Sequence, residues 1–455
     1  MKLISPSLKI DPLKPFSSDL FERQIYGDSL RNVISRVDDS IVVTLDASWG
    51  EGKTTFLRMW QADLKLQGIQ SIYFDAFEHD YSDDPFLDIV SEICSFVDEE
   101  FADSVAIIEP NKELKSKASV VCRRLLGWSA KVAVKAATLG AIKDSDIEDL
   151  EAIGKDISKD AGDITSQLVN EKINSHSEEK RTLSSFKKSI ETLGKAIKKS
   201  QDFPLMIVID ELDRCRPSYA IEVIEKIKHL FSAENVVFLL AVNTRQLQES
   251  IKSVYGSIDA NTYLKKFVNI ETQLPKRHGY TQINDYTQYA SHLFDAHEFE
   301  QWLDKDALVS VTSCFGEYYK LSLRDIERVF TNLAIHYISV KENTLNLIPV
   351  IVLLAVCRVK LPEVFLKLKD KKLTYDEFNS ELELTGISNN YYTKIYPEHF
   401  VTCFKYCLFS DADYHNEGSS SDIKHMNIGP QYRIGRNEII PWYCSSIEAF
   451  SFNAN

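Results

Sequence analysis

The sequence predicts an α/β fold in which a parallel sheet is flanked by helices. Short apolar runs rich in β-branched residues recur at positions 41–45, 205–209 and 236–242. Such runs are typical of parallel strands that are buried on both faces. The first run leads through a glycine-containing loop into a helical pattern. This alternation of strand and helix favours crossover connections on both faces of one sheet.

The elements around the first strand follow from side-chain spacing. Residues 27–37 carry apolar side chains at helical intervals, which predicts a helix ahead of the strand. Residues 71–74 form a second short run and predict a second strand. Asp84 and Pro85 then mark a helix start. Aspartate accepts hydrogen bonds from the free backbone N–H groups there, and proline fits the first helical turn.

The domain organisation follows from shifts in composition. Between residues 100 and 200 the chain is rich in Lys, Glu, Asp and Ser with few aromatic residues, which predicts a helical insertion. A further helix is expected to begin near Pro217, between the last two core strands. We therefore expect a core domain over 1–275 that contains the insertion, a mainly helical lid over 276–365 and a C-terminal mixed region over 366–455.

Charge and cysteine content limit the class of protein. The formal net charge is -14, whereas non-specific nucleic-acid binding needs a cationic surface, so the sequence carries no strong nucleic-acid signal. Eight scattered cysteines in 455 residues are too few for a disulfide framework. They predict reduced thiols in a cytoplasmic protein.

Two apolar segments are candidates for membrane contact. Residues 345–357 are strongly apolar but too short to span a bilayer, and we expect a buried helix there. Residues 125–142 have nearly the length of a span, but Lys131 and Lys135 lie in the middle, where each costs about 3 kcal/mol. A soluble helix is favoured, and peripheral membrane contact is the alternative. Residues 1–16 lack the apolar stretch of a secretory signal.

A phosphate-binding loop is predicted after the first strand. In such loops, backbone N–H groups and the dipole of the following helix bind phosphates. The lysine reaches the β- and γ-phosphates, and the hydroxyl residue after it holds Mg²⁺. Here these residues are Lys53 and Thr54, and Ala47 replaces the usual opening glycine. The residues expected around the nucleotide are Ala47, Ser48, Trp49, Gly50, Glu51, Gly52, Lys53, Thr54 and Thr55.

The second half of the site is predicted at the ends of two later strands. Asp210 and Glu211 directly follow the strand at 205–209, and ligands bind beyond the carboxyl ends of strands in such sheets. Asp210 is expected to hold Mg²⁺ through water, and Glu211 to activate the attacking water as general base. Asn243 follows the strand at 236–242. It is either a sensor of the γ-phosphate or a polar cap.

Together these residues resemble the KAP family of P-loop nucleoside triphosphatases, in the additional-strand branch that includes signalling ATPases. The resemblance extends from about residue 15 to residue 365. The family's run Asp-Asp-Leu-Asp-Arg-Cys-x-Pro is similar to Asp210-Glu211-Leu212-Asp213-Arg214-Cys215-Arg216-Pro217. Other family-like segments are Asp75-Ala76-Phe77, Tyr263-Leu264-Lys265-Lys266 with Leu274-Pro275, and Ser322-Leu323-Arg324-Asp325-Ile326-Glu327-Arg328.

The resemblance implies an enzyme that hydrolyses ATP with Mg²⁺ and acts as a nucleotide-dependent switch, in bacterial anti-phage defence or in signalling. A protein partner or a homo-oligomer is expected. Arg324 on the predicted lid helix is a candidate catalytic sensor of the γ-phosphate. The alternative is a surface arginine paired with Asp325 or Glu327. The alternative function is a nucleotide-binding scaffold with negligible turnover.

Overall fold

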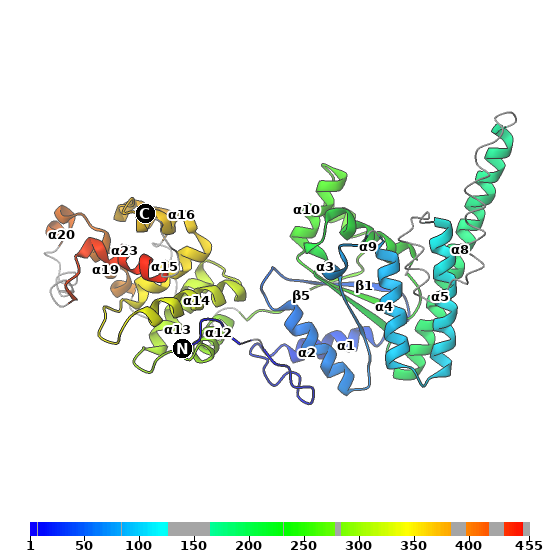
Figure 1. The fold of residues 1–455 in the computed structure, drawn as a ribbon, viewed down its shortest axis with the longest axis horizontal. Helices are drawn as coiled ribbons and strands as arrows, with labels where there is room; N and C mark the ends of the chain where they lie inside the picture. The colour runs from blue at the N-terminus through cyan, green and yellow to red at the C-terminus, as the bar shows by residue number, and fades with distance from the viewer. Residues whose placement is uncertain are drawn as a thin grey trace. The chain divides into compact units, whose positions relative to one another are not determined.

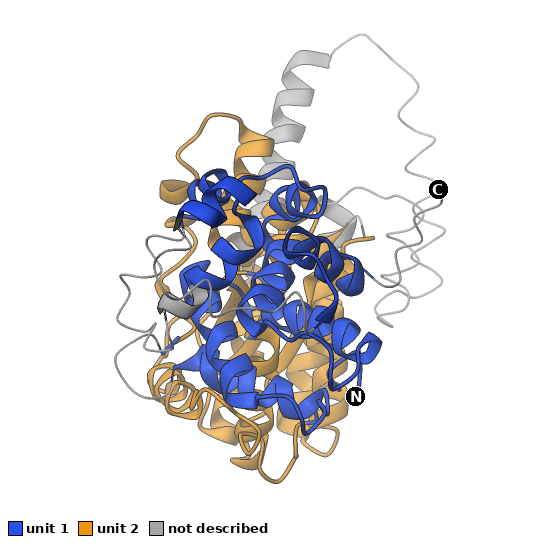
Figure 2. Cartoon of the chain, turned by 90° about the vertical axis from the view of Figure 1, so that its left-hand side faces the viewer, with its two compact units in different colours: residues 1–9, 49–52, 276–455 blue, residues 10–48, 53–275 orange. Residues whose placement is uncertain are grey.

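The computed structural model describes residues 1–455 except 7, 83, 126–163, 231, 278–283, 384–396, 418–431 and 449–455. The chain divides into two compact units (Figure 2). The sheet unit consists of Ile10–Ser48 and Lys53–Pro275, and the helical unit of Met1–Lys9, Trp49–Gly52 and Lys276–Asn455. The predicted core strands therefore lie in one unit, and the predicted lid and C-terminal region lie together in the other.

The sheet unit is built on five parallel strands, which confirms the predicted α/β fold (Figure 1). The strands are β1 (Ile41–Asp46), β2 (Ile72–Asp75), β3 (Leu205–Asp210), β4 (Val236–Val242) and β5 (Ile270–Gln273), in the order β2-β3-β4-β1-β5. The register pairs Asp75 with Asp210, and Asp46 with Val242. Because all strands run the same way, their carboxyl ends form one edge, along which these acidic residues lie.

Helices cover both faces of the sheet. In β1, Val42 packs into one hydrophobic cluster while Val43 and Leu45 pack into the other, as the two-residue period of a strand requires. The side chains of α1 (Gln24–Ile34) and α2 (Lys53–Leu66) belong to the cluster of Val43. The cluster of Val42 is built from α4 (Pro85–Glu100), α5 (Val105–Leu125), α8 (Ile164–Gln201), α9 (Pro217–Leu230), α10 (Thr244–Tyr255) and α11 (Ala260–Leu264).

The described part of the predicted insertion is helical. Helix α4 begins where the sequence predicts, because Asp84 accepts a hydrogen bond from the N–H of Phe86 at 3.1 Å and Pro85 occupies the first turn. Helices α5 and α8 then pack against each other. The segment 125–142 lies almost wholly outside the described residues. Within the part of the chain that is described, no helix has the length and apolar character needed to cross a bilayer.

The edge strand β5 is the one strand of this sheet that the apolar pattern does not predict. Its burial alternates between half-buried and exposed positions, because Glu271 and Gln273 face solvent. Strand β5 pairs only with β1, through the register Val43–Ile270 to Asp46–Gln273. A polar edge strand obtains its order from the backbone of its neighbour, so it leaves no apolar run in the sequence.

The helical unit has a single hydrophobic core. Helix α15 (Ile348–Lys360) begins next to Pro349 and buries all of residues 350–357, in agreement with the buried helix predicted at 345–357. The predicted boundary between the lid and the C-terminal region lies at residue 365. The same core includes side chains on both sides of that position, and α16 (Pro362–Lys369) runs across it. The other helices are α12 (Asp285–Ala296), α13 (Lys305–Tyr318), α14 (Leu323–Ser339), α17 (Tyr375–Leu382), α19 (Pro397–Leu408), α20 (Asp411–Glu417), η3 (Arg436–Glu438) and α23 (Ile439–Ile447).

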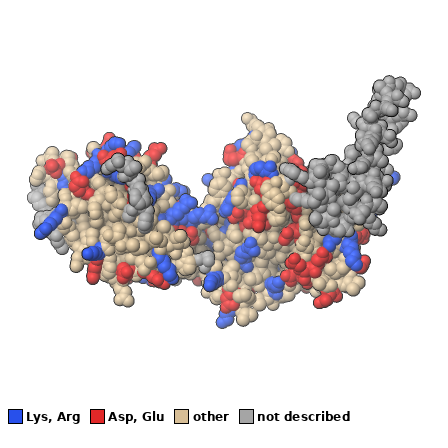
Figure 3. Space-filling view, viewed as in Figure 1, with Lys and Arg blue, Asp and Glu red and all other residues tan. Residues whose placement is uncertain are grey.

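Surface charge is mixed on the face shown in Figure 3, where acidic and basic side chains are interspersed among uncharged ones. The whole chain carries a formal net charge of -14. The face shown is therefore not the uniformly cationic surface that non-specific nucleic-acid binding requires.

A buried histidine makes the stability of the helical unit depend on pH. His336 of α14 is 1% exposed, and its Nδ1 lies 2.6 Å from the hydroxyl of Ser446 in α23. Burial lowers the pKa of His336 to about 4 from 6.5. Because the unfolded chain binds this proton more tightly, stability is present above pH 6.5 and is lost as the pH falls toward 4.

We expect the free energy of unfolding to fall by about 2 kcal/mol between pH 7 and pH 5 through this group. Urea unfolding at the two pH values measures the change, and His336→Gln should remove that part of it. Equal pH dependence in both proteins would contradict the assignment.

Candidate nucleotide-binding site

The loop between β1 and α2 has the backbone that the glycine positions predict. Gly50 and Gly52 adopt φ values of +79° and +81°, which other residues reach only at a cost. Ala47, at the position of the usual opening glycine, is not among the residues with positive φ, so alanine fits there without strain. Its N–H donates to the carbonyl of Val242 at the end of β4, at 3.2 Å.

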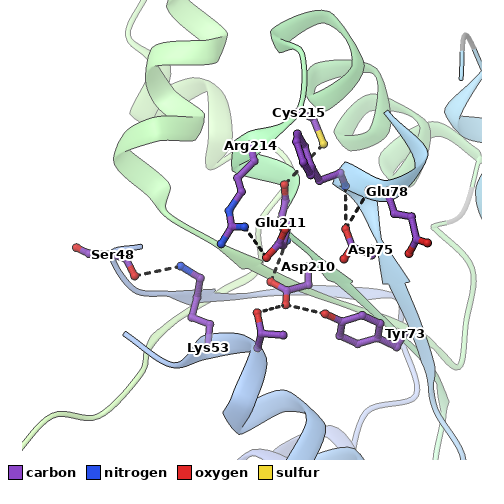
Figure 4. Close-up of polar contacts among 11 residues, drawn as sticks. Ser48, Lys53, Tyr73, Asp75, Glu78, Asp210, Glu211, Arg214 and Cys215 are labelled. Carbon is purple, nitrogen blue, oxygen red and sulfur yellow. Dashed lines mark hydrogen bonds and ion pairs between the residues drawn. The ribbon is translucent and has the colours of Figure 1, made fainter. Parts of the chain in front are cut away.

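Lys53 opens helix α2 and is 8% exposed. Its Nζ donates to the carbonyl of Ala47 and lies 3.5 Å from the carbonyl of Ser48 (Figure 4). Burial lowers its pKa, while the charges of Asp213, Asp210 and Asp46 oppose that shift. The ammonium group is thus held at the mouth of the loop, where its charge lacks full solvation and favours an anionic ligand.

Asp210 connects the loop helix to the far strand. Strand β4 separates β3 from β1, so Asp210 and the phosphate loop follow strands that are not neighbours. The start of α2 spans this gap, because Thr54 Oγ1 donates to Asp210 Oδ2 at 2.7 Å. Asp210 is 1% exposed, and its Oδ1 accepts from the N–H of Glu211 at 2.8 Å. The two predicted Mg²⁺ ligands, Thr54 and Asp210, are therefore in direct contact.

Tyr73 of β2 is a member of this cluster that the sequence reasoning missed. Its hydroxyl donates to Asp210 Oδ2 at 2.8 Å (Figure 4), the same atom that accepts from Thr54 Oγ1. The guanidinium of Arg58 lies 3.7 Å above the tyrosine ring. Burial, followed by the charge of Asp210, raises the pKa of Tyr73, so the hydroxyl keeps its proton and stays a donor. Only the pairing of β2 with β3 could have indicated this contact.

Glu211 lies one residue beyond β3 in an unusual backbone conformation. Its φ of 60° and ψ of 18° are left-handed, which is uncommon for a residue with a side chain. Its Oε1 is 2.7 Å from Nη1 of Arg214. Burial raises the pKa of Glu211, Arg214 opposes that shift, and nearby carboxylates including Asp75 add to it. Residues with side chains that are held in this region are strained, and such positions cluster at functional sites.

Asn243 and Thr55 lie near the same edge of the sheet. Asn243 follows β4 and caps α10, since its side chain accepts from the N–H of Gln246 at 3.4 Å. The cap interpretation therefore describes a contact that exists, and the sensor role remains a prediction. Thr55, on the outer side of α2, is exposed.

The helical unit contains the tip of the loop, Trp49–Gly52, and the predicted sensor Arg324. Within that unit the N–H of Arg324 donates to the carbonyl of Gly50 at 3.1 Å, and the side chain of Arg324 is exposed. Glu51 is 5% exposed and forms an ion pair with Lys276, which offsets a charge that would repel phosphate. Trp49 is 41% exposed.

The two proposed partners of Arg324 have other contacts. Asp325 completes a capping box with Ser322 at the start of α14, and Glu327 accepts a hydrogen bond from Tyr289. Both carboxylates are therefore engaged elsewhere, and the sensor role of Arg324 remains a prediction.

The glycine-containing loop leads into a helix that begins at a buried lysine. The threonine after that lysine donates a hydrogen bond to an aspartate at the end of a parallel strand that is not adjacent to the strand before the loop. Together these features define a P-loop nucleotide-binding domain. The model of the KAP family P-loop domain matches residues 23–340. The chain belongs to this family, as the motif run from Asp210 to Pro217 predicts.

One curated relative is similar to this chain at low sequence identity. Phage T7 exclusion protein of Escherichia coli (strain K12) is 22% identical over 169 residues, which are 36% of this chain and 22% of that protein. The chain thus spans about a fifth of that relative's length.

Two structures of the Aeropyrum pernix ORC2 protein, an ADPNP–ADP form and an ADP form, have TM-scores of 0.33 and 0.32 at 11% identity. Each match covers 98% of this chain and 96% of the other. A likeness at this score does not bear on the fold or function of the present chain.

Proposed function

We propose that the chain binds and hydrolyses ATP with Mg²⁺ and acts as a nucleotide-dependent switch. The observation that carries this proposal is the 2.7 Å contact between Thr54 and Asp210. A hydroxyl from the loop helix and a carboxylate from a strand end are the oxygen ligands that Mg²⁺ takes in P-loop enzymes. The chemistry of the donor set therefore fits the metal.

The proposed mechanism assigns a task to each residue. The loop from Ala47 to Thr55 binds the phosphates through its backbone N–H groups, and Lys53 neutralises the charge of the β- and γ-phosphates. Thr54 would hold Mg²⁺ directly and Asp210 through water, and the metal when bound would neutralise charge on the phosphate oxygens. Glu211 accepts a proton from the attacking water. Asn243 and Arg324 are proposed contacts to the γ-phosphate.

The proposed biological setting comes from the matching relative and from the family resemblance. The matching relative is named a phage exclusion protein, and the family resemblance adds signalling roles. We propose a cytoplasmic switch in defence against phage, or in signalling, whose nucleotide state controls a protein partner or self-assembly. Peripheral membrane contact through residues 125–142 is the alternative location.

The experiment that tests the proposed activity measures nucleotide binding and phosphate release by the full chain. We expect binding of ATP in preference to GTP, and phosphate release that EDTA abolishes. Tight binding of Mg-ATP without measurable release would favour the nucleotide-binding scaffold instead. Absence of binding would overturn both functions. Light scattering with and without Mg-ATP would show whether nucleotide drives assembly.

Tyr73 provides a test of the proposed metal site. Tyr73→Phe removes one of the two hydroxyl donors to Asp210 Oδ2, so the carboxylate loses part of its fixed orientation. Partners of metal ligands are worth about tenfold or more in metal affinity. We therefore expect the Mg²⁺ concentration for half-maximal hydrolysis to rise about tenfold.

The matched control is Tyr219→Phe, which removes a tyrosine–aspartate hydrogen bond, to Asp88 at 3.3 Å, that does not involve Asp210. That variant should keep the wild-type Mg²⁺ dependence. Identical Mg²⁺ curves for Tyr73→Phe and wild type would show that Tyr73 does not orient the ligand.

A further inference from the structure

Glu211 and Arg214 are joined twice within one tight turn. The N–H of Arg214 donates to the carbonyl of Glu211 at 3.0 Å, and Nη1 of Arg214 lies 2.7 Å from Oε1 of Glu211. The turn is the 3-10 segment η2 (Leu212–Arg214), with Glu211 as its N-cap. The three-residue spacing across this turn places the guanidinium of Arg214 within reach of the Glu211 carboxylate.

The backbone of Glu211 is held on both sides, and its side chain is anchored by the ion pair with Arg214. Its N–H donates to Asp210 Oδ1 at 2.8 Å, and its carbonyl also accepts from the thiol of Cys215 at 3.7 Å. The carboxylate side chain is 18% exposed and that of Arg214 is 32% exposed. The direction of the Glu211 carboxylate is therefore set by the contact with Arg214 (Figure 4).

Charge around the turn makes this contact more important. The carboxylates of Asp75, Asp210 and Asp213 all act on Glu211, and the guanidinium of Arg214 opposes them. The elements packed against the turn are β4, α3 (Ala76–His79) and α10. They add Glu78 and His79 of α3 and Arg245 of α10 to the charged residues of this region. Without Arg214, like charges would push the Glu211 carboxylate toward solvent.

The neighbouring Arg216 contacts Asp80 and Ser82. Its Nε lies 2.9 Å from Asp80 Oδ1, its backbone N–H donates to Asp80 Oδ2 at 2.9 Å, and Nη2 donates to the carbonyl of Ser82 at 2.9 Å. The two arginines on either side of Cys215 therefore have separate partners. This separation makes Arg216 a matched control for Arg214.

We propose that Arg214 is the positioning residue of Glu211, and that it aims the carboxylate of the general base at the attacking water. This inference rests on the proposed hydrolysis. Arg214 acts through Glu211, so its role is to fix an orientation, and misplacement of a reacting group by about 1 Å can cost about 100-fold in rate.

The test is a double-mutant cycle on the full chain. Arg214→Gln should lower the single-turnover rate of ATP hydrolysis by about 10- to 100-fold, with the ATP Kd changed less than about threefold. In the Glu211→Gln background the same change should have an effect below about twofold, because the group that Arg214 positions is gone. Arg216→Gln should leave the rate near that of wild type.

Two further measurements separate positioning from structural loss. Guanidinium ion at millimolar concentration should partly restore Arg214→Gln and leave Arg216→Gln unchanged. Arg214→Lys retains the charge without the planar fork and should fall between wild type and Arg214→Gln. If Arg214→Gln fails to fold, the Arg214→Lys cycle with Glu211→Gln decides the question.

The outcomes distinguish the two proposals. A wild-type rate in Arg214→Gln, or equal losses with and without Glu211, would overturn the positioning role while hydrolysis stands. A wild-type chain that binds Mg-ATP and releases no phosphate would overturn the proposed function and the positioning role together.

Discussion

Glu211→Gln should lower ATP hydrolysis by about 100- to 10,000-fold while the ATP Kd changes less than about threefold. The amide keeps the size of the side chain and one hydrogen-bond acceptor, but it cannot take the proton of the attacking water. Binding is expected to depend on other groups, namely the loop backbone and Lys53. Single-turnover hydrolysis and equilibrium binding of a fluorescent ATP analogue measure the two quantities separately.

A second acidic residue supplies the control for this prediction. Glu222 of α9 has a 41% exposed side chain and pairs with Lys226 at 3.4 Å, so Glu222→Gln should leave hydrolysis unchanged. The assignment of Glu211 as general base would be wrong if Glu211→Gln hydrolysed ATP at the wild-type rate. Loss of binding and hydrolysis in equal proportion would indicate instead that Glu211 supports the fold of the site.

Lys53→Ala should weaken ATP binding by about 100-fold or more, which corresponds to about 3 kcal/mol, and should abolish measurable hydrolysis. The lysine is 8% exposed and burial lowers its pKa, so the chain holds a poorly solvated cation at the loop. Such a cation interacts strongly with an incoming triphosphate. We expect it also to stabilise the charge that develops during phosphoryl transfer, so the loss in rate should exceed the loss in binding.

The same physics predicts that the fold survives this substitution. Removing a buried charge relieves a desolvation cost, and alanine is favourable in a helix, so thermal stability should be equal to or above that of wild type. Lys65→Ala, in the last turn of the same helix, is the control: its side chain is 60% exposed and pairs with Glu100 at 2.8 Å. It should bind ATP within about twofold of wild type. Normal ATP binding by Lys53→Ala would refute the phosphate-binding role.

The sequence by itself determines most of the sheet unit, because local patterns carry the information. A buried parallel strand must be apolar along its length, so β1, β3 and β4 leave continuous apolar runs. Loop positions with a positive φ favour glycine, and the sequence has glycine at both, Gly50 and Gly52. The run from Asp210 to Pro217 predicts the family, and the match of the family model over residues 23–340 agrees.

Several features of the site depend on which strands are neighbours, and no local pattern records that. The order β2-β3-β4-β1-β5 places Tyr73 beside Asp210, although 137 residues separate them in the chain. Edge strand β5 is polar and ordered by β1, so it carries no apolar signal. The contact of Thr54 with Asp210 across the end of β4 likewise exists only in the folded sheet.

The pairing of charged side chains near the site is set by a local turn for Arg214 and by tertiary structure for Arg216. The sequence places Arg214 and Arg216 two residues apart, with acidic residues on both sides. The 3-10 turn directs Arg214 to Glu211, and the 136-residue separation between Asp80 and Arg216 closes only when β2 pairs with β3. The sequence therefore predicts which residues carry the proposed chemistry, since their types and local backbone are encoded nearby. Tertiary structure decided the contacts between residues that are far apart in the sequence, such as Asp80 with Arg216, because strand pairing and helix packing alone set those distances.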